Sequence, residues 1–240
     1  MKDISLPVKP AIIFLVLVLM SAGGCASTAF QVRPNLAEDP EKRRIVLLTP
    51  DVELSILHAG GLPEPHAEWT RLAKKHIADN LARRFRNINA QLVKRVEKPE
   101  EVGSDPQEVQ LLKLHGAVGR SILIHQYDGA PLQLPTKKDK FAWTMGSGTG
   151  YLKQKYGADY ALFVFVRDSY TSSGRVAAII FAALLGVHIQ GGIQLGFSSL
   201  VDLDTGEVVW FNRLLRGTGD LRTPAGANET VGVLLSNFPQ

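Results

Sequence analysis

The fold of this chain is decided by the stretch Tyr160-Ala-Leu-Phe-Val-Phe-Val166. A continuous apolar run rich in aromatic and β-branched side chains is typical of a strand that is buried on both faces of a sheet. Such sheets carry helices on both sides. Residues 160–166 are therefore predicted to form the central strand of a layered α/β domain.

A period of two extends over residues 187–203. It predicts a long strand with one apolar and one polar face. Asp204-Thr205-Gly206 is expected to form a turn, and residues 207–211 the returning strand of a hairpin. The apolar odd positions are Val187, Ile189, Ile193, Leu195, Phe197, Val201 and Leu203, and the polar even positions are His188, Gln190, Gln194, Ser198 and Asp202.

Periodicity and capping signals predict the remaining elements. Residues 45–48 and 90–96 are expected strands. Asp105-Pro106-Gln107-Glu108 has the capping-box arrangement of a helix start. Helices are expected over residues 66–88, 105–126 and 149–156, and from residue 223 onward. This order predicts an α/β layered sandwich, a mixed central β-sheet of about five strands with helices packed on it.

One apolar segment separates the two long predicted strands, namely residues 174–186, Gly-Arg-Val-Ala-Ala-Ile-Ile-Phe-Ala-Ala-Leu-Leu-Gly. It shows no alternation. A buried hydrophobic helix or strand is the first interpretation. A surface that meets a membrane or another copy of the chain is the second.

Composition describes a globular chain. Of 240 residues, 45% are hydrophobic and 21% are charged, which excludes a disordered or multi-span membrane protein. The net charge of +4 is too small to indicate nucleic acid as a partner. The single cysteine excludes an intramolecular disulfide.

The N-terminus has the features of a secretory signal. Lys2 and Lys9 precede ten apolar residues, 11–20, and then small residues up to Gly24 and Cys25. The apolar run is shorter than the ~20 residues of a spanning helix. Ala22-Gly23-Gly24-Cys25 resembles a bacterial lipobox, which implies cleavage between Gly24 and Cys25 and lipidation of Cys25. An ordinary secretory signal and a membrane-anchor helix are the alternatives.

Three regions follow from this interpretation. Residues 1–24 are predicted to be a lipoprotein signal peptide, residues 25–44 a lipidated N-terminus and flexible tether, and residues 45–240 a periplasmic α/β domain. Stable anchoring takes more than one acyl chain, which a lipoprotein cysteine provides. Resemblance to known lipoproteins implies that Ala26 after the cysteine directs the protein to the outer membrane.

The helix expected over residues 66–88 has a basic side opposite its apolar side. A solvated surface is the first interpretation of these cations, and contact with anionic lipid headgroups or another polyanion is the second. The residues are Arg71, Lys74, Lys75, Arg83, Arg84 and Arg86.

No catalytic or metal-binding constellation emerges. His66 and His76, like His115 and His125, point to different sides of a helix. Gly146-Ser-Gly-Thr-Gly150 lacks the lysine of a phosphate-binding loop, and no Gly-x-Ser-x-Gly motif occurs. We therefore expect no catalytic residue, metal or cofactor. The aspartates near element ends are expected in turns and caps, with an acid–base pair as the alternative: Asp159, Asp168, Asp202 and Asp220.

Two motifs resemble a known group of periplasmic lipoproteins. Tyr156-Gly157-Ala158-Asp159-Tyr160 leads into the core strand, and residues 199–210, Ser-Leu-Val-Asp-Leu-Asp-Thr-Gly-Glu-Val-Val-Trp, form the hairpin. Both are similar to the curli-secretion lipoprotein CsgG and to the TolB amino-terminal domain. This resemblance implies an anticodon-binding-domain-like α/β layer used for assembly and protein contact.

The function expected is a structural or interaction module in envelope assembly, secretion or transport. Its expected partners are the membrane, through Cys25, and envelope proteins, including further copies of the chain; no nucleic acid is expected. The alternatives are an oligomeric export-channel component, since CsgG extends segments of this domain into the membrane, and an envelope hydrolase.

Overall fold

The computed structural model describes residues 30–32, 44–86, 91–94, 105–126, 132–137, 140–217 and 219–239. The elements in these ranges are, in chain order, β1 (Phe30–Val32), β2 (Arg44–Leu47), β3 (Asp51–Leu57), β4 (Pro63–Pro65), α2 (Ala67–Phe85), β5 (Gln91–Lys94), α3 (Pro106–His125), η2 (Ser147–Thr149), α4 (Gly150–Tyr156), β6 (Tyr160–Thr171), α5 (Ser173–Leu184), β7 (Gln194–Asp202), β8 (Val208–Arg216) and α6 (Pro224–Leu234).

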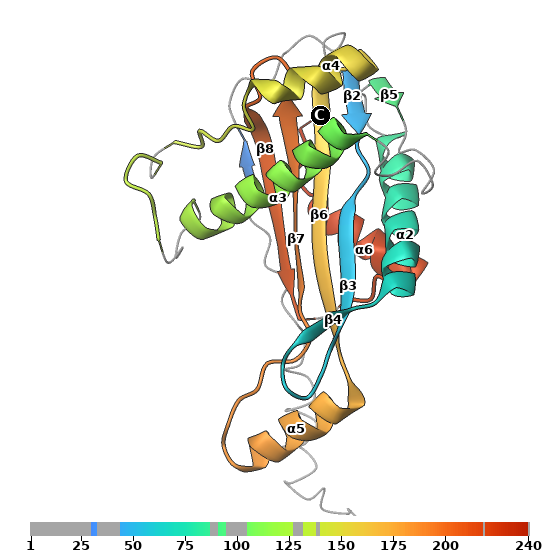
Figure 1. Cartoon of the computed structure of the whole chain (residues 1–240), viewed down its shortest axis with the longest axis vertical. Coiled ribbons are helices and arrows are strands. Elements are labelled where there is room, and N and C mark those ends of the chain that lie inside the picture. Colours follow the sequence, from blue (N-terminus) through green and yellow to red (C-terminus); the bar gives the residue numbers. More distant parts are fainter. Residues whose placement is uncertain are drawn as a thin grey trace, which may run out of the picture.

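Within the described ranges, eight strands form one mixed, open sheet (Figure 1). Six of them follow the order β1-β8-β7-β6-β2-β5, and the other two, β3 and β4, pair with each other beside β6. β6 pairs in parallel with β2 and then with β3, and antiparallel with β7. The α/β class and the mixed sheet are confirmed. The sheet has more than the predicted five or so strands because β1, β3 and β4 were not expected. β1 lies inside the segment predicted to be the tether and pairs with β8.

The central strand is covered on both faces, as predicted. α2 and α6 pack on one face of the sheet and α3 on the other (Figure 1). Val164 of β6 belongs to the core under α2 and α6, whereas Phe163 and Phe165 belong to the core under α3. β6 thus contributes alternate side chains to two separate apolar layers.

The strand predicted over residues 187–203 is shorter, because β7 begins only at Gln194. Two of its predicted polar positions, Gln194 and Ser198, do not face water, whereas His188 and Gln190, which precede β7, are exposed. Gln194 and Ser198 are 1% and 0% exposed, and the Ser198 hydroxyl donates to the carbonyl of Leu234 at 2.6 Å. Within β7, Gln194 and Ser198 therefore lie on a buried face, where residues of α6 supply hydrogen-bond partners.

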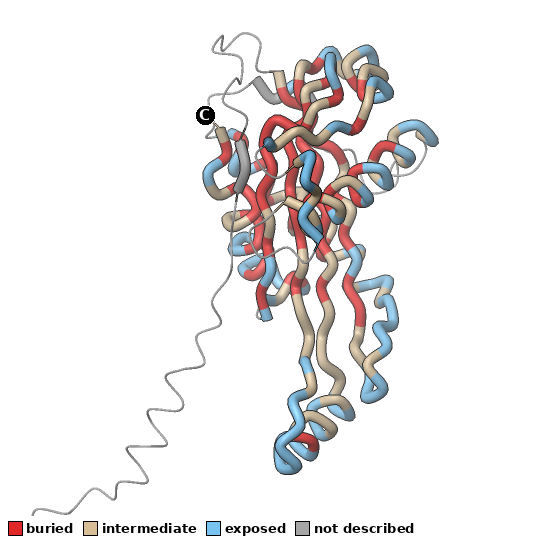
Figure 2. The backbone as a smooth tube through the Cα atoms, turned by 90° about the vertical axis from the view of Figure 1, so that its left-hand side faces the viewer, coloured by how far each residue is buried: buried red, intermediate tan, exposed pale blue. Residues whose placement is uncertain are grey.

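The apolar segment 174–186 forms helix α5, which projects beyond the sheet at the junction of β6 and β7 (Figures 1 and 2). Ala182 is the one α5 residue that is buried. The interpretation as a buried element is therefore wrong, and the interpretation as an exposed surface fits. Among the described residues, none of the helices combines the length and hydrophobicity needed to cross a bilayer.

Candidate functional site

Of the twelve exposed large apolar side chains among the described residues, six lie on α5 or just after it. We call these six side chains the tip patch. Leu184 is 80% exposed and Phe181 66% exposed, although both are large apolar side chains. The tip patch consists of Val176, Ile180, Phe181, Leu184, Leu185 and Val187.

Both ends of α5 are well capped. The Ser172 hydroxyl accepts from the backbone N–H of Arg175 at 3.2 Å, which satisfies a free donor of the first turn. At the other end Gly186 adopts φ 75°, and the N–H groups of Gly186 and Val187 donate to Ala183 and Ala182. This is a Schellman ending, for which glycine is favoured because of the positive φ. The helix is therefore locally specified, although it has almost no core contacts.

Arg175 fastens the base of α5 to the sheet. Its guanidinium donates to the carbonyl of Gln190 at 2.7 Å and to that of Ala59, in the β3–β4 hairpin, at 3.3 Å. The one charged side chain of the helix is thus used on backbone carbonyls. The result is a tip patch presented in a defined position at one end of the molecule.

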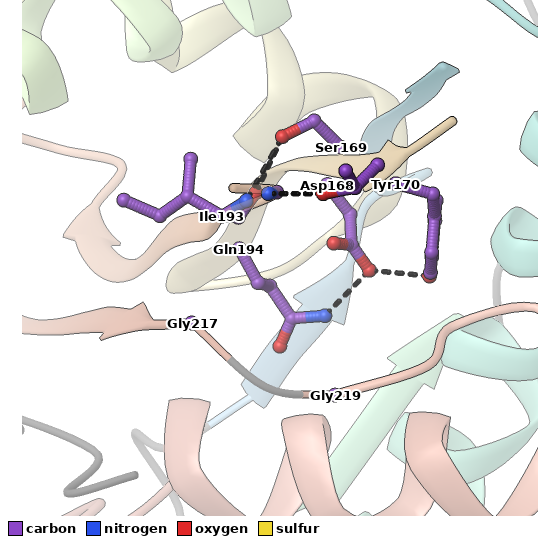
Figure 3. A pocket seen from close by; sticks show the side chains of 9 residues that line it. Asp168, Ser169, Tyr170, Ile193, Gln194, Gly217 and Gly219 are labelled. Atoms are coloured by element: carbon purple, nitrogen blue, oxygen red, sulfur yellow. Dashed lines mark hydrogen bonds between the residues drawn. The ribbon is translucent and has the colours of Figure 1, made fainter. Parts of the chain in front are cut away.

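A second candidate is a polar cavity of about 150 Å³ on the α6 side of the sheet, next to Asp168 (Figure 3). One oxygen of the Asp168 carboxylate accepts from Tyr170 at 2.6 Å and from Gln194 at 2.8 Å. The pKa of Asp168 is raised above its usual value because the carboxyl is buried, although these two hydrogen bonds act in the opposite direction. Gln194 in turn accepts from Arg216 at 2.7 Å and from Thr230 at 3.0 Å, so the network reaches α6.

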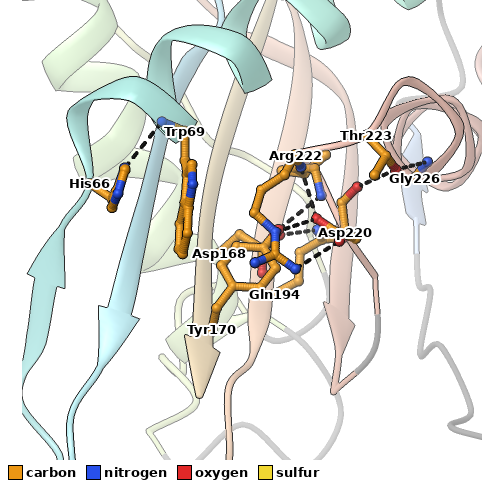
Figure 4. Close-up of polar contacts among 10 residues, drawn as sticks. His66, Trp69, Asp168, Tyr170, Gln194, Asp220, Arg222, Thr223 and Gly226 are labelled. Carbon is orange, nitrogen blue, oxygen red and sulfur yellow. Dashed lines mark hydrogen bonds and ion pairs between the residues drawn. The ribbon is translucent and has the colours of Figure 1, made fainter. Parts of the chain in front are cut away.

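Tyr170, which lines the cavity, also belongs to an aromatic and cationic stack (Figure 4). The Arg222 guanidinium lies 4.1 Å from the ring centre of Tyr170 and 4.9 Å from that of Trp69. Arg222 also forms two hydrogen bonds of 2.8 Å with Asp220, which lower the pKa of that carboxyl. Among the described lining residues Asp168 is the only carboxylate, so the cavity itself offers no pair of acids for hydrolysis.

The other aspartates singled out in the sequence have structural partners. Asp159 pairs with Arg44 at 2.8 Å, which joins the start of β6 to β2. Asp202 accepts from the backbone of Asp204 and Thr205 and shapes the β7–β8 turn. Asp202 has the turn role that the sequence predicts, whereas Asp159 forms an ion pair that links the start of β6 to β2. In the described part of the chain no three His, Cys, Asp or Glu side chains are grouped for a metal ion.

The basic residues of α2 lie on its outward side. Arg71 is paired with Glu68 at 2.7 Å and Lys75 with Asp79 at 2.8 Å, both within the helix. Arg83 donates to Asn80 at 2.7 Å. Such exposed pairs contribute little stability, but they reduce the positive field of this side. The other basic residues of this side are Lys74, Arg84 and Arg86.

Gly24 and Cys25, the predicted cleavage and lipidation residues, lie outside the described residues. The tip patch is the part of the site that sequence reasoning left open. Its composition was visible, but its exposure depends on which elements cover α5, and no local pattern encodes that.

No protein-family model matches the chain, and no curated protein matches its sequence. Three solved structures are weakly similar to this chain. The PelC dodecamer from Paraburkholderia phytofirmans is 12% identical with a TM-score of 0.42, covering 88% of this chain and 96% of that one. A variant of that dodecamer gives a TM-score of 0.41 at the same identity and coverage. A DUF4136 family protein from Bacteroides thetaiotaomicron is 12% identical with a TM-score of 0.31, covering 90% of this chain and 96% of that one.

Proposed function

We propose that this protein is a lipid-anchored module of the bacterial cell envelope, held at the periplasmic side of the outer membrane through Cys25, and that it acts by contact rather than catalysis. The tip patch is the observation that carries the proposal. Six large apolar side chains exposed at one end of the molecule do not stabilise a protein whose whole surface is in contact with water.

The free energy of that exposure supports a contact role. Each square ångström of apolar surface removed from water contributes roughly 25 cal/mol, and large exposed apolar patches mark protein or membrane contacts. Folding leaves this surface uncovered, so a second molecule gains that free energy when it covers the patch. The fixed base at Arg175 keeps the patch ready for such a contact.

The anchor is tested by replacing Cys25 with serine. Serine keeps the size of the side chain but cannot form the thioether that carries the acyl groups. We expect Cys25→Ser to remain an unprocessed precursor without incorporated palmitate, and to leave the outer-membrane fraction. Ser27→Ala is the matched control and keeps both the label and the fractionation. The proposal is wrong if Cys25→Ser carries palmitate and fractionates like the unaltered protein.

A further inference from the structure

We propose that the tip patch inserts into the interfacial region of a lipid bilayer, so that α5 is a second membrane contact beside the acyl anchor. This deepens the proposed function and rests on it only for the presence of a membrane. The occupant inferred is the lipid surface itself, at the boundary between headgroups and acyl chains.

The width of the exposed apolar arc favours lipid over a protein partner. At 3.6 residues per turn, the exposed positions from Ala183 through Val176 to Leu185 cover an arc of about 200° around the helix axis. A helix that packs on a protein surface needs an apolar stripe of only about 100°. The wider arc of α5 suits an apolar medium that surrounds the helix on most sides.

The charges of the segment point the same way. From Ser172 to Ile193 there is no carboxylate and no lysine. The one arginine, Arg175, is held at the base of the helix by the carbonyls of Gln190 and Ala59. Insertion therefore buries no carboxylate. Burial of a charged side chain in the bilayer would cost free energy. The cation stays at the level where anionic headgroups lie.

The length of α5 sets the depth. Its 12 residues make a helix of about 18 Å, whereas the hydrocarbon core is about 30 Å thick. α5 thus enters one leaflet without crossing. Interfacial helices of this kind bury their apolar side by about 5–10 Å.

The direction of β1 bears on where the proposed anchor can lie. Phe30 lies opposite Asn212 and Val32 opposite Trp210, so the N-terminal end of β1 points toward the end from which α5 projects. Cys25 precedes Phe30 by five residues, which reach about 17 Å at most. One bilayer at this end can accept both contacts.

The test uses the mature lipoprotein reconstituted into vesicles of phosphatidylethanolamine and phosphatidylglycerol. Acylation blocks the only natural thiol, so Phe181→Cys and Leu184→Cys each offer one site for an environment-sensitive fluorophore. We expect a blue-shifted emission and strong quenching by lipids that carry a spin label on the acyl chain. Arg71→Cys, on the outward side of α2, is the control and shows neither effect.

A charged variant checks that the apolar surface causes the insertion. Leu185→Glu in the Phe181→Cys background lowers the quenching to the level of the Arg71→Cys control, while the thermal unfolding midpoint stays unchanged. Emission that shifts without lipid quenching means that a second copy or another protein covers the patch, and overturns the inference. Absence of palmitate labelling at Cys25 in the unaltered protein contradicts the proposed function instead. Failure of this inference and failure of the proposed function are therefore distinguishable.

Discussion

At the scale of single residues, His115 of α3 is the clearest buried titratable group. It is 1% exposed, its Nε2 lies 2.9 Å from the hydroxyl of Ser199, and its ring stacks on Phe163 with centres 4.9 Å apart. Burial lowers the pKa of His115 to about 3. The imidazole is therefore neutral in the folded protein over the whole physiological range.

This pKa shift makes stability depend on pH with a defined sign. Below pH 6.5 the unfolded chain binds a proton at His115 that the folded chain does not bind. The free energy of unfolding should fall on acidification from pH 6.5 toward about 3, by up to about 1.4 kcal/mol for each pH unit. Urea unfolding at several pH values measures the slope.

Replacing the histidine isolates its contribution. His115→Gln keeps a hydrogen-bonding group for Ser199 but cannot titrate, so its unfolding free energy should depend less on pH in this window. His188→Gln, on the exposed segment after α5, is the matched control and keeps the full slope. An unchanged slope in His115→Gln would assign the acid sensitivity to other groups.

The network around Asp168 shows the limit of prediction at this scale. Its aspartate was singled out in the sequence, but its partner Gln194 is 26 residues away, and Gln194 meets Thr230 a further 36 residues along. Only the antiparallel pairing of β6 with β7 and the packing of α6 bring these residues together. Spacing along the chain carries no record of such contacts.

At the scale of elements, α3 depends on glycine for its close approach to the sheet. A Cβ at Gly119 would lie 2.0 Å from Cε2 of Phe197, and one at Gly116 would lie 3.3 Å from Phe165. Glycine within a helix weakens it by itself. These two glycines persist because the aromatic rings of β6 and β7 fill the space beside them.

Because of this close packing, replacing Gly119 by alanine should destabilise the protein, although the same change stabilises most helices. In an open helix Gly→Ala stabilises by about 1 kcal/mol, but Gly119→Ala must displace α3 or Phe197 and should destabilise by roughly 1–3 kcal/mol. Gly174→Ala in α5, where the nearest atom is 3.9 Å away, is the control and should be neutral or slightly stabilising. Denaturant titration compares the two, and equal effects would refute the packing argument.

Local signals predicted most of the elements. The helix start predicted at Asp105 is confirmed, since its side chain accepts the backbone N–H groups of Gln107 and Glu108. The helix expected from residue 223 onward is also confirmed, and Thr223 caps it by accepting the N–H of Gly226. Glu108 does not complete a capping box in the way that the sequence suggests, because its carboxylate accepts from Lys155 and Tyr156 of α4. A tertiary contact replaces the local one.

The missed strands have different physical reasons. β3 alternates in Asp51-Val-Glu-Leu-Ser-Ile-Leu57, so its signal was present. β1 and β4 have three residues each, too few for any period to be recognised. The late start of β7 at Gln194, compared with the predicted strand 187–203, has another cause, since a sequence period cannot show how far the neighbouring strands extend.

At the scale of the whole molecule, the protein has a body with two apolar cores and a tip that contributes to neither. The strands β6 and β7 are already joined below the tip: Ser169 and Ile193 exchange backbone and hydroxyl hydrogen bonds, and the Thr171 hydroxyl accepts from Gly192 at 2.7 Å. α5 adds one buried residue, Ala182. Stability and contact are therefore assigned to separate parts of the chain.

This separation predicts that the tip can be removed without unfolding the body. Replacing residues 172–190 by Asn-Gly links Thr171 to Gly191 through a two-residue hairpin turn. The deletion removes the exposed apolar surface and only one buried side chain, so the thermal unfolding midpoint should change by less than about 4 °C, which corresponds to about 1 kcal/mol in a chain of this size. Crosslinking in intact envelopes should at the same time lose the neighbours that the unaltered protein contacts through α5.

A second variant, in which Gly-Ser repeats replace residues 173–185, keeps the length of the unaltered protein. It separates loss of the helix from shortening of the loop, and should lose the same neighbours. A deletion that unfolds the body would show that α5 belongs to the folding unit, and one that folds but keeps every neighbour would remove the tip patch from the contact surface of this protein.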